Sequence, residues 1–302
     1  MKSNYDIIWL DSVDSTNDEA RRHISDLDNL SVLTAMSQTK GRGQGDHIWL
    51  SEPGKNLLFS IVLKYSDGRS ERPSTPAVQA YDQFVISQIA SLSAVDLLAA
   101  YDIQARIKWP NDIYVGDRKI CGMLIEHLVR GKWLSSSIIG IGLNINQRNF
   151  DVNLPNPTSV ALCNDESVQT FDLQELLEEF MDIFSDYLDR FCHITGGYNR
   201  LNRLYRAQLW RLDQPAEFID LTDGFIDLTD GFIDQATGAH IDLPSGTTNL
   251  PARTICHRSP LSPAATPFRG IIRGTSPVGH LLVELPDGTT REFAFKEISY
   301  VL

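Results

Sequence analysis

Apolar residues follow two different periodicities along the first two thirds of the chain. Short apolar runs with strand-like composition predict β-strands over 5–10, 33–38, 56–64, 113–115, 119–129 and 136–146. Longer segments, with apolar residues three and four positions apart, predict helices over 76–100, 171–191 and 198–210. Strands mixed with separate helices indicate an α+β domain built on a mixed sheet.

A further helix is predicted after the first strand, and it should end near Leu27. Ser15 and Thr16 offer side-chain oxygens for its N-cap, and Asp18 and Glu19 follow three residues later. This spacing is typical of a capping box, in which the cap side chain accepts from the first helical N–H groups.

The sequence changes in character near Leu212. Residues 218–224 read FIDLTDG and residues 225–231 repeat them, which favours a lengthened hairpin because seven residues are too few for a solenoid unit. Residues 235–268 hold five prolines and many small polar residues, as in a mobile insertion. Strand-like runs after Gly270 predict a small barrel-like β domain. We therefore expect a large α+β domain over 1–212 and a small β domain over 213–302.

Composition narrows the class of protein. With 302 residues, 42% hydrophobic and 22% charged, the chain is typical of a soluble globular protein. A net charge of −12 without a clustered basic face argues against DNA binding. No obvious apolar run of about 20 residues or signal peptide is seen, so neither a membrane span nor export is expected. The four cysteines and seven histidines show no metal-ligand spacing, which favours a cytoplasmic protein without a structural metal.

Residues 41–49, GRGQGDHIW, place Arg42 between two glycines. Glycines allow close approach to a ligand, and a guanidinium can clamp a carboxylate or phosphate through two hydrogen bonds. An ordinary surface turn is the alternative. Strand-like sequence lies on both sides of the loop, which argues against phosphate loops that open a helix.

Two more polar clusters follow, KWPND over 108–112 and RKICG over 118–122. Lys119 either points to solvent or neutralises a ligand that lies against Gly122. Asn111 and Asp112 either end a strand or offer oxygens to a phosphate-bound Mg²⁺.

Several other residues allow two interpretations. Trp49 and Trp109 are core residues or ligand-stacking residues, and Asn144 is a strand-end cap or a partner for a nucleobase edge. His47 lacks a nucleophile or carboxylate at a recognisable spacing. Cationic groups for two anions, without a dedicated nucleophile, predict activation of a carboxylate by adenylation.

These clusters resemble those of the biotin–protein ligases, also named biotin–[acetyl-CoA-carboxylase] ligases. The resemblance runs over about residues 5–212, through DSTN at 14–17, Gln38, the 41–43 loop, 108–112, 119–122 and 140–144. It implies a class II synthetase-like catalytic domain and an SH3-like C-terminal domain. It also implies formation of biotinyl-5′-AMP from biotin and Mg²⁺-ATP, followed by transfer to one lysine of a biotin carboxyl carrier domain.

The resemblance assigns roles by position. Catalysis is expected of Arg42, Lys119 and Asp112, with Asp112 also orienting the lysine amine. Contacts to biotin are expected of Ser15, Thr16, Asn17, Gln38, Arg42, Gly43, Gln44, Lys119 and Gly122. Contacts to ATP are expected of Arg42, Gln44, Trp49, Lys108, Asn111, Asp112, Lys119 and Asn144, and Mg²⁺ is expected at Asn111 and Asp112.

Two features depart from the family pattern. Gln44 replaces a second arginine that many members carry, and Asp46 stands where glycine is frequent. Only 13 residues precede Asp14, too few for a helix-turn-helix module, so we expect a ligase without a repressor function. A monomer or weak homodimer is expected.

Two other functions compete with biotin ligation. A lipoate–protein ligase or octanoyl transferase has a similar fold, but KWPND together with the GRG loop favours biotin. A non-catalytic biotin or carrier-domain sensor could dispense with Lys119 and Asn111, and this chain keeps both.

Overall fold

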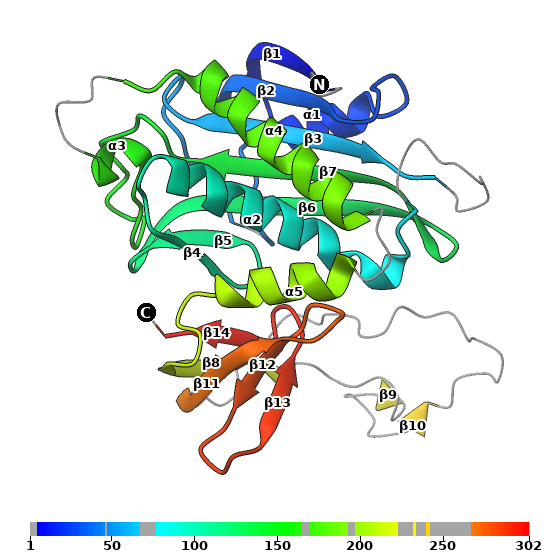
Figure 1. Cartoon of the computed structure of the whole chain (residues 1–302), viewed down its shortest axis with the longest axis vertical. Coiled ribbons are helices and arrows are strands. Elements are labelled where there is room, and N and C mark those ends of the chain that lie inside the picture. The colour runs from blue at the N-terminus through cyan, green and yellow to red at the C-terminus, as the bar shows by residue number, and fades with distance from the viewer. Residues whose placement is uncertain are drawn as a thin grey trace. The chain divides into compact units, whose positions relative to one another are not determined.

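The structure is a computed structural model, and it describes residues 5–45, 47–66, 77–164, 170–192, 197–222, 232–233, 240–241 and 267–301 (Figure 1). The chain divides into two compact units. The first contains Met1–Leu212 together with Gly274–Leu281, and the second contains Asp213–Arg273 and Leu282–Leu302. Both units are α+β or β structures, in agreement with the predicted class.

A seven-stranded mixed sheet forms the centre of the first unit, in the order β1-β2-β3-β7-β6-β5-β4. Its strands are β1 (Asp6–Val13), β2 (Ser31–Gln38), β3 (Leu57–Lys64), β4 (Ala105–Lys108), β5 (Asp112–Val115), β6 (Arg118–Arg130) and β7 (Trp133–Leu143). Only β1 and β2 run parallel, and the other neighbouring pairs are antiparallel. The connection between β1 and β2 contains a helix, as is usual for the crossover that a parallel pair requires.

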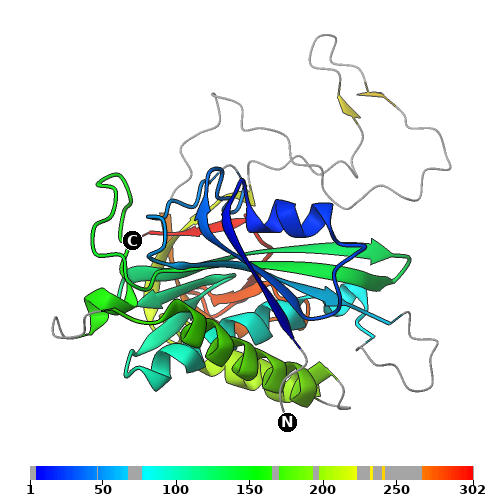
Figure 2. The ribbon, with the colours of Figure 1, turned by 90° about the horizontal axis from the view of Figure 1, so that it is seen from above.

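Helices lie on both faces of this sheet. They are α1 (Thr16–Arg22), the 3₁₀ turn η1 (Ala80–Asp82), α2 (Phe84–Ala100), α3 (Val160–Cys163), α4 (Leu173–Cys192) and α5 (Gly197–Ala207). Figure 2 shows α1 on one face, with α2 and α4 on the opposite face. The Phe59 ring of β3 packs edge-to-face on Phe180 of α4, with 5.2 Å between centroids. One face of the sheet is therefore closed by two long helices, and the short α1 lies on the other.

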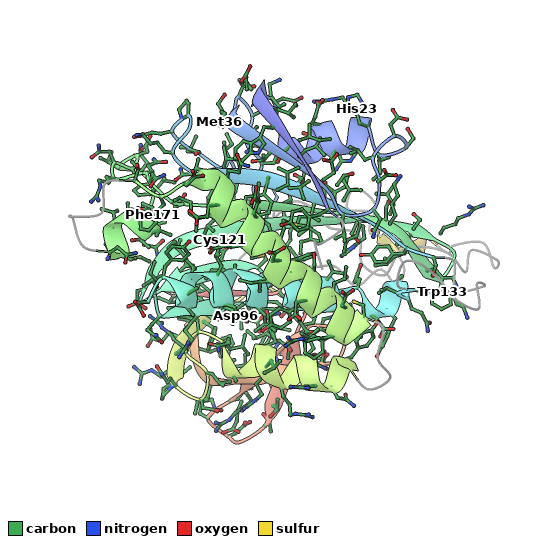
Figure 3. All side chains as sticks on the ribbon, turned by 45° about the horizontal axis from the view of Figure 1, so that its top comes forward. His23, Met36, Asp96, Cys121, Trp133 and Phe171 are labelled. Atoms are coloured by element: carbon green, nitrogen blue, oxygen red, sulfur yellow. The ribbon has the colours of Figure 1, made fainter. Side chains whose placement is uncertain are left out.

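The long helix α2 is apolar on almost all sides. Ala80–Ala100 meets the length and composition criteria for a membrane span, so the expectation that no such run exists was wrong. Most of this stretch is buried within the fold. A helix between a sheet and further helices has little solvent-facing surface, which explains its composition. Asp96, labelled in Figure 3, accepts a hydrogen bond of 2.7 Å from Tyr187 of α4.

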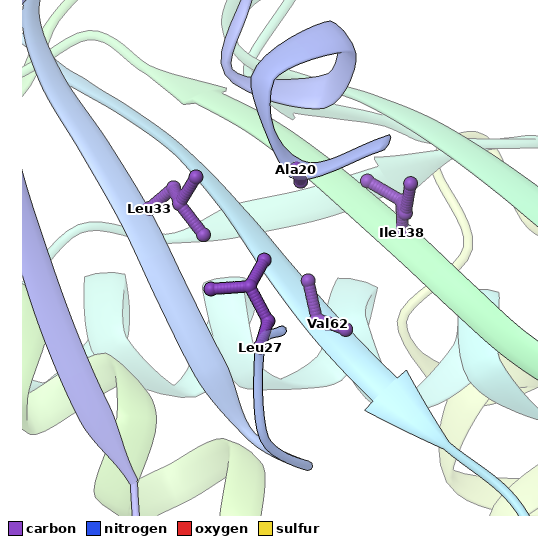
Figure 4. Packing of buried hydrophobic residues seen from close by; sticks show 5 residues of the cluster. All are labelled: Ala20, Leu27, Leu33, Val62 and Ile138. Atoms are coloured by element: carbon purple, nitrogen blue, oxygen red, sulfur yellow. The ribbon is translucent and has the colours of Figure 1, made fainter. Parts of the chain in front are cut away.

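Helix α1 packs on the sheet through a small apolar cluster. Figure 4 shows Ala20 of α1 and Leu27, which follows the helix, together with Leu33, Val62 and Ile138 of three neighbouring strands. The predicted capping box is wrong, because the Ser15 side chain makes no cap hydrogen bond. The Thr16 N–H instead donates to the Gln38 side-chain oxygen at 2.7 Å. A residue distant in sequence thus takes the place of the local cap.

Several predicted boundaries shift, because backbone groups find partners outside their own element. The first helix ends at Arg22 rather than Leu27, and the second begins at Phe84 because Gln79 forms a β-bridge with Trp133. Strand β7 ends at Leu143, where Asn144 N–H donates to Ile120 O. Helix α5 ends at Ala207 rather than 210, because 208–210 pair with β4 instead.

The second unit is built on a five-stranded sheet in the order β13-β12-β11-β8-β14. Its strands are β8 (Pro215–Asp220), β11 (Pro267–Thr275), β12 (Leu281–Glu284), β13 (Thr290–Phe293) and β14 (Ile298–Tyr300). Two short paired strands, β9 (Phe232–Ile233) and β10 (His240–Ile241), are also described. The second FIDLTDG copy, and the predicted insertion apart from 240–241 and 267–268, lie outside the described residues.

From a half-buried histidine near the turn between β6 and β7, we predict that stability depends on pH. His127 Nδ1 lies 2.6 Å from Ser137 Oγ, and burial lowers the pKa of His127 from 6.5 to about 4. Between those values the unfolded chain binds more protons than the folded chain. The free energy of unfolding should therefore decrease as the pH falls from 6.5 to about 4.

We expect this loss to be about 1–2 kcal/mol, less than the full shift, because the ring keeps some solvent contact. Urea unfolding of the wild type and of His127→Gln at several pH values would measure it. The variant should show a flatter stability profile over this window. An unchanged slope would show that another group is responsible, and His23→Gln on the surface is the matched control.

Candidate functional site

Three glycines on neighbouring strands form the centre of the candidate site, and we call them the glycine patch (Gly122, Gly140 and Gly142). Gly122 faces Gly142 across β6 and β7, and Gly140 faces Leu124. Residues two apart on a strand share a face, so all three lie on one face of the sheet. Gly140 faces Asn17 of α1, which identifies this as the α1 face.

Neighbouring side chains lie directly on the backbone of this patch. A Cβ at Gly140 would stand 2.2 Å from Asn17 Oδ1, and one at Gly142 would stand 2.4 Å from Trp49 Cε2. A Cβ at Gly122 would lie 2.8 Å from Trp49 Cζ3. Such distances are far inside van der Waals contact, so only glycine fits at these positions.

The described residues of the loop, 41–45 and 47–49, form a small hairpin. The Gly43 N–H donates to His47 O at 2.7 Å, and the Trp49 N–H donates to Gly41 O at 3.0 Å. Arg42 forms a β-bridge with Ile48 inside this hairpin. The loop therefore connects two strands without opening a helix, as predicted. It brings the Trp49 ring onto the glycine patch.

Arg42 is held by two carboxylates rather than extending freely into solvent. Its Nη1 lies 2.7 Å from Asp18 Oδ1, and its Nη2 lies 3.2 Å from Glu126 Oε1. Asp18 belongs to α1 and Glu126 to β6, so the guanidinium bridges the helix and the sheet. The loop arginine is thus anchored beside the α1 end of the glycine patch.

Lys119 stands at the other end of the patch. Its Nζ lies 2.7 Å from Asp112 Oδ1 and 5.5 Å from the centroid of the Trp49 ring. A Cβ on Gly122 would be 3.1 Å from the same Nζ, so the lysine lies over this glycine. Arg42 and Lys119 pair with different carboxylates. On this face of the sheet, Arg42 therefore has two acidic partners, Asp18 and Glu126, and Lys119 is paired with Asp112.

The residues predicted to bind biotin come together from α1 and β2. Ser15, Thr16 and Asn17 are buried, and both the N–H and the hydroxyl of Thr16 bond to Gln38 Oε1 at 2.7 and 3.2 Å. Ser60 of β3 lies 2.8 Å from Thr16 Oγ1 and 2.7 Å from Asn17 Oδ1. These side chains form one connected polar network beside the glycine patch.

The KWPND segment forms the turn between β4 and β5. Trp109 is buried, and its Nε1 donates at 2.8 Å to Gly279 O in the same unit, which agrees with its interpretation as a core residue. Asn111 Nδ2 donates to the Met123 carbonyl and fixes the turn to β6. Burial lowers the pKa of Lys108, whose Nζ lies 4.9 Å from the Tyr114 ring centroid. Asp112 faces Lys108 across the strand pair and bonds Lys119.

Within the part of the chain that the structure describes, two buried polar atoms near the patch have no hydrogen-bond partner. They are Trp49 Nε1, a donor, and Asn144 Oδ1, an acceptor. Asn144 Nδ2 is bonded to Thr158 O at 2.9 Å, which fixes the amide. A buried polar atom without a hydrogen bond lowers stability by about 1–3 kcal/mol, so a bound ligand that pairs with such an atom would remove this penalty. A nucleobase edge carries both acceptors and donors, which are the groups that pair with a free N–H donor and a free carbonyl acceptor.

Sequence reasoning missed Asp18 and Glu126 as partners of Arg42, and Ser60 as a partner of Asn17. The signal for Glu126 was its spacing of four from Gly122 on one strand, which puts both residues on one face. Asp46 lies outside the described residues. Among the residues that the structure describes, no three His, Cys, Asp or Glu side chains gather as a metal site.

A family model and similar curated proteins point to the same kind of ligase. Residues 9–144 match the Biotin/lipoate A/B protein ligase family. "Biotin--protein ligase 1, chloroplastic" of Arabidopsis thaliana is 30% identical over 201 residues, covering 66% of this chain and 51% of that protein. "Biotin--[acetyl-CoA-carboxylase] ligase" of Paracoccus denitrificans is 26% identical over 203 residues, covering 67% of this chain and 80% of that protein.

The fold has a counterpart among solved structures. The biotin protein ligase of Aquifex aeolicus, solved in complex with biotin and ATP, superposes with a TM-score of 0.66 at 21% identity and covers 98% of both chains. The matched region of this chain spans about half the length of the first curated relatives. Residues 9–144, which carry the glycine loop, the glycine patch and both cations, are therefore the part of the chain that matches the Biotin/lipoate A/B protein ligase family.

Proposed function

We propose that this protein is an ATP-dependent biotin–protein ligase. The observation that carries the proposal is the glycine patch with Arg42 at one end and Lys119 at the other, beside the buried Ser15–Asn17 network. Glycines allow a ligand to lie against the backbone, and the two cations suit a carboxylate and a phosphate. The names of the relatives favour biotin over lipoate as the acid that is activated.

The first step would join biotin to AMP. A biotin carboxylate oxygen attacks the α-phosphorus of ATP, the bond from that phosphorus to the bridging oxygen breaks, and pyrophosphate leaves. Two anions must approach each other, so catalysis consists of alignment and charge neutralisation. Lys119 and Arg42 would supply positive charge to the reacting carboxylate and phosphate. Their present partners, Asp112 and Asp18 with Glu126, keep both cations in place before substrate arrives.

The second step would transfer biotin to a carrier lysine. The ε-amine attacks the acyl carbon, AMP departs from the mixed anhydride, and the new amide loses a proton. Asp112 would orient the incoming amine, because its carboxylate already binds an ammonium group at 2.7 Å. A biotin carboxyl carrier domain is the partner that this chemistry requires.

The nucleotide would lie against Trp49 and Asn144. The unpartnered Trp49 Nε1 and Asn144 Oδ1 fit a base that offers an acceptor and a donor. Gln44 and Lys108 would contact the phosphates together with Lys119. Asp112 and Asn111 offer the oxygen donors that Mg²⁺ prefers, and the ion would neutralise phosphate charge on arrival with ATP.

A direct assay tests the proposal. The protein would be mixed with biotin, Mg²⁺-ATP and a biotin carboxyl carrier domain, and intact mass would be measured. We expect a biotin-sized mass gain on one lysine and biotin-dependent exchange of labelled pyrophosphate into ATP. Exchange with lipoate or octanoate but not biotin would favour a lipoate-type ligase. Biotin binding without exchange would favour a non-catalytic sensor.

Gln44 predicts weak retention of the adenylate. An amide at this position can donate hydrogen bonds but carries no charge, whereas arginine would form a charge-assisted pair worth about 1.5–3 kcal/mol. We therefore expect Gln44→Arg to slow release of biotinyl-AMP about tenfold or more, since each 1.4 kcal/mol corresponds to a factor of ten. Filter binding after a chase with unlabelled biotin measures the rate. An unchanged release rate would contradict the prediction, and Gln44→Met controls for side-chain volume.

A further inference from the structure

We propose that Glu126 is a positioning residue that fixes the Asn17 amide and the Arg42 guanidinium relative to each other. This inference rests on the proposed biotin site and extends it to a residue outside the sequence clusters from which that site was predicted. The Glu126 side chain is only 23% exposed and accepts from three partners, Asn17, Arg21 and Arg42. One carboxylate thus connects α1, the glycine loop and β6.

The first connection orients Asn17. Asn17 Nδ2 donates to Glu126 Oε2 at 2.9 Å and to Leu124 O at 3.1 Å, so both of its N–H groups are used. Asn17 Oδ1 accepts from Ser60 Oγ at 2.7 Å and lies against Gly140. A flipped amide would place its oxygen against two acceptors, which is unfavourable. Glu126 therefore holds the Asn17 amide in one orientation over the glycine patch.

The second connection holds Arg42 without using all its donors. A guanidinium has five N–H donors, and the described side-chain bonds of Arg42 take one to Asp18 and one to Glu126. The remaining N–H groups can still bind a carboxylate or phosphate. The two carboxylates thus act as fixed supports for the cation, which reduces the entropy lost when a ligand binds.

Positioning and simple charge predict opposite results when Glu126 is neutralised. A carboxylate beside an anion site repels the ligand, so its neutralisation should strengthen biotin binding if charge alone mattered. If Glu126 positions Asn17 and Arg42, neutralisation should weaken binding. The sign of the change therefore decides between the two roles.

The test compares Glu126→Gln with Asp18→Asn in the full-length protein. Both variants remove a carboxylate from Arg42, but only Glu126→Gln also disturbs Asn17. We expect Glu126→Gln to weaken biotin binding, measured by calorimetry, about tenfold, the factor associated with loss of a hydrogen bond to a charged group. Asp18→Asn should change biotin affinity by less than about threefold, because the described bonds of Asp18 do not include one to Asn17 and a partly exposed ion pair contributes little.

A readout that needs no ligand separates this inference from the proposed function. Hydrogen exchange of the Gly43 and Trp49 amides, which are bonded inside the loop hairpin, should be faster in Glu126→Gln than in the wild type. Glu126→Asp, which keeps the charge but shortens the reach, should give intermediate affinity and exchange. Thermal unfolding of each variant checks that the fold is kept.

The outcomes distinguish failure of the proposed function from failure of the positioning role of Glu126. Wild-type protein that neither binds biotin nor exchanges pyrophosphate would overturn the proposed function. A wild type that does both, with Glu126→Gln binding biotin equally well or more tightly, would overturn the positioning role. If Glu126→Gln fails to fold, the affinity and loop exchange of Glu126→Asp decide, and wild-type values for both would overturn the inference.

Discussion

Lys119→Ala should lower biotin-dependent pyrophosphate exchange by about 10²–10³, with the fold kept. Removal of a positioned charge donor from a site where negative charge develops typically raises the barrier by about 2.7–4 kcal/mol. Lys119 qualifies because its Nζ is fixed at 2.7 Å from Asp112 and lies over Gly122 beside the Trp49 ring. The Lys119–Asp112 pair is about one quarter to one third exposed, so its loss should have little effect on stability.

The measurement is the rate of label transfer from pyrophosphate to ATP at saturating biotin. Lys132→Ala, on an exposed turn of the same sheet, is the matched control and should keep full activity. Near-native exchange in Lys119→Ala would remove this lysine from the catalytic role. An equal loss in both variants would point to a general charge effect on the negatively charged protein.

Gly140→Ala is expected to abolish tight biotin binding and to lower stability. The added methyl group would stand 2.2 Å from Asn17 Oδ1, inside van der Waals contact. Asn17 has no room to retreat, because it is 3% exposed and bonded to Ser60, Leu124 and Glu126. Overpacking of this kind costs about 1–3 kcal/mol. We expect a Tm decrease of about 2–10 °C and biotin affinity reduced by about tenfold or more.

The control for Gly140→Ala is the neighbouring variant Ile141→Val. Ile141 is buried on the opposite face of β7, so this change costs about 0.5–1.5 kcal/mol without touching the glycine patch. Calorimetry with biotin and thermal unfolding would be run on both. If the two variants lost stability equally and kept native biotin affinity, the ligand would not lie beside Asn17.

The periodic elements could be predicted from the sequence because the spacing of apolar residues along each element is a local pattern. Strand β3 is recognised from its continuous run of apolar residues, and helix α4 from apolar residues three and four positions apart. Their ends could not be read in the same way. The first helix has no side-chain cap from Ser15, because Gln38 on another strand supplies the acceptor. Backbone partners distant in sequence decide such boundaries.

The motif residues were also identified from the sequence, since glycine, arginine and lysine in short clusters have distinctive chemistry. Arg42, Lys119, Asp112 and Asn17 do lie around one face of the sheet, although their roles in binding and catalysis remain proposals. What the sequence could not give was the acidic environment of Arg42. Glu126 stands 84 residues away from it along the chain.

From the sequence alone, the family resemblance, the α+β class and the cationic clusters were determined, because they depend on residue type and local spacing. The tertiary structure alone decided which carboxylate holds which cation, and that three glycines from two strands share one face. It also decided that Trp49 and Asn17 lie on those glycines. These relations depend on strand register, which brings residues far apart in the chain within hydrogen-bonding distance.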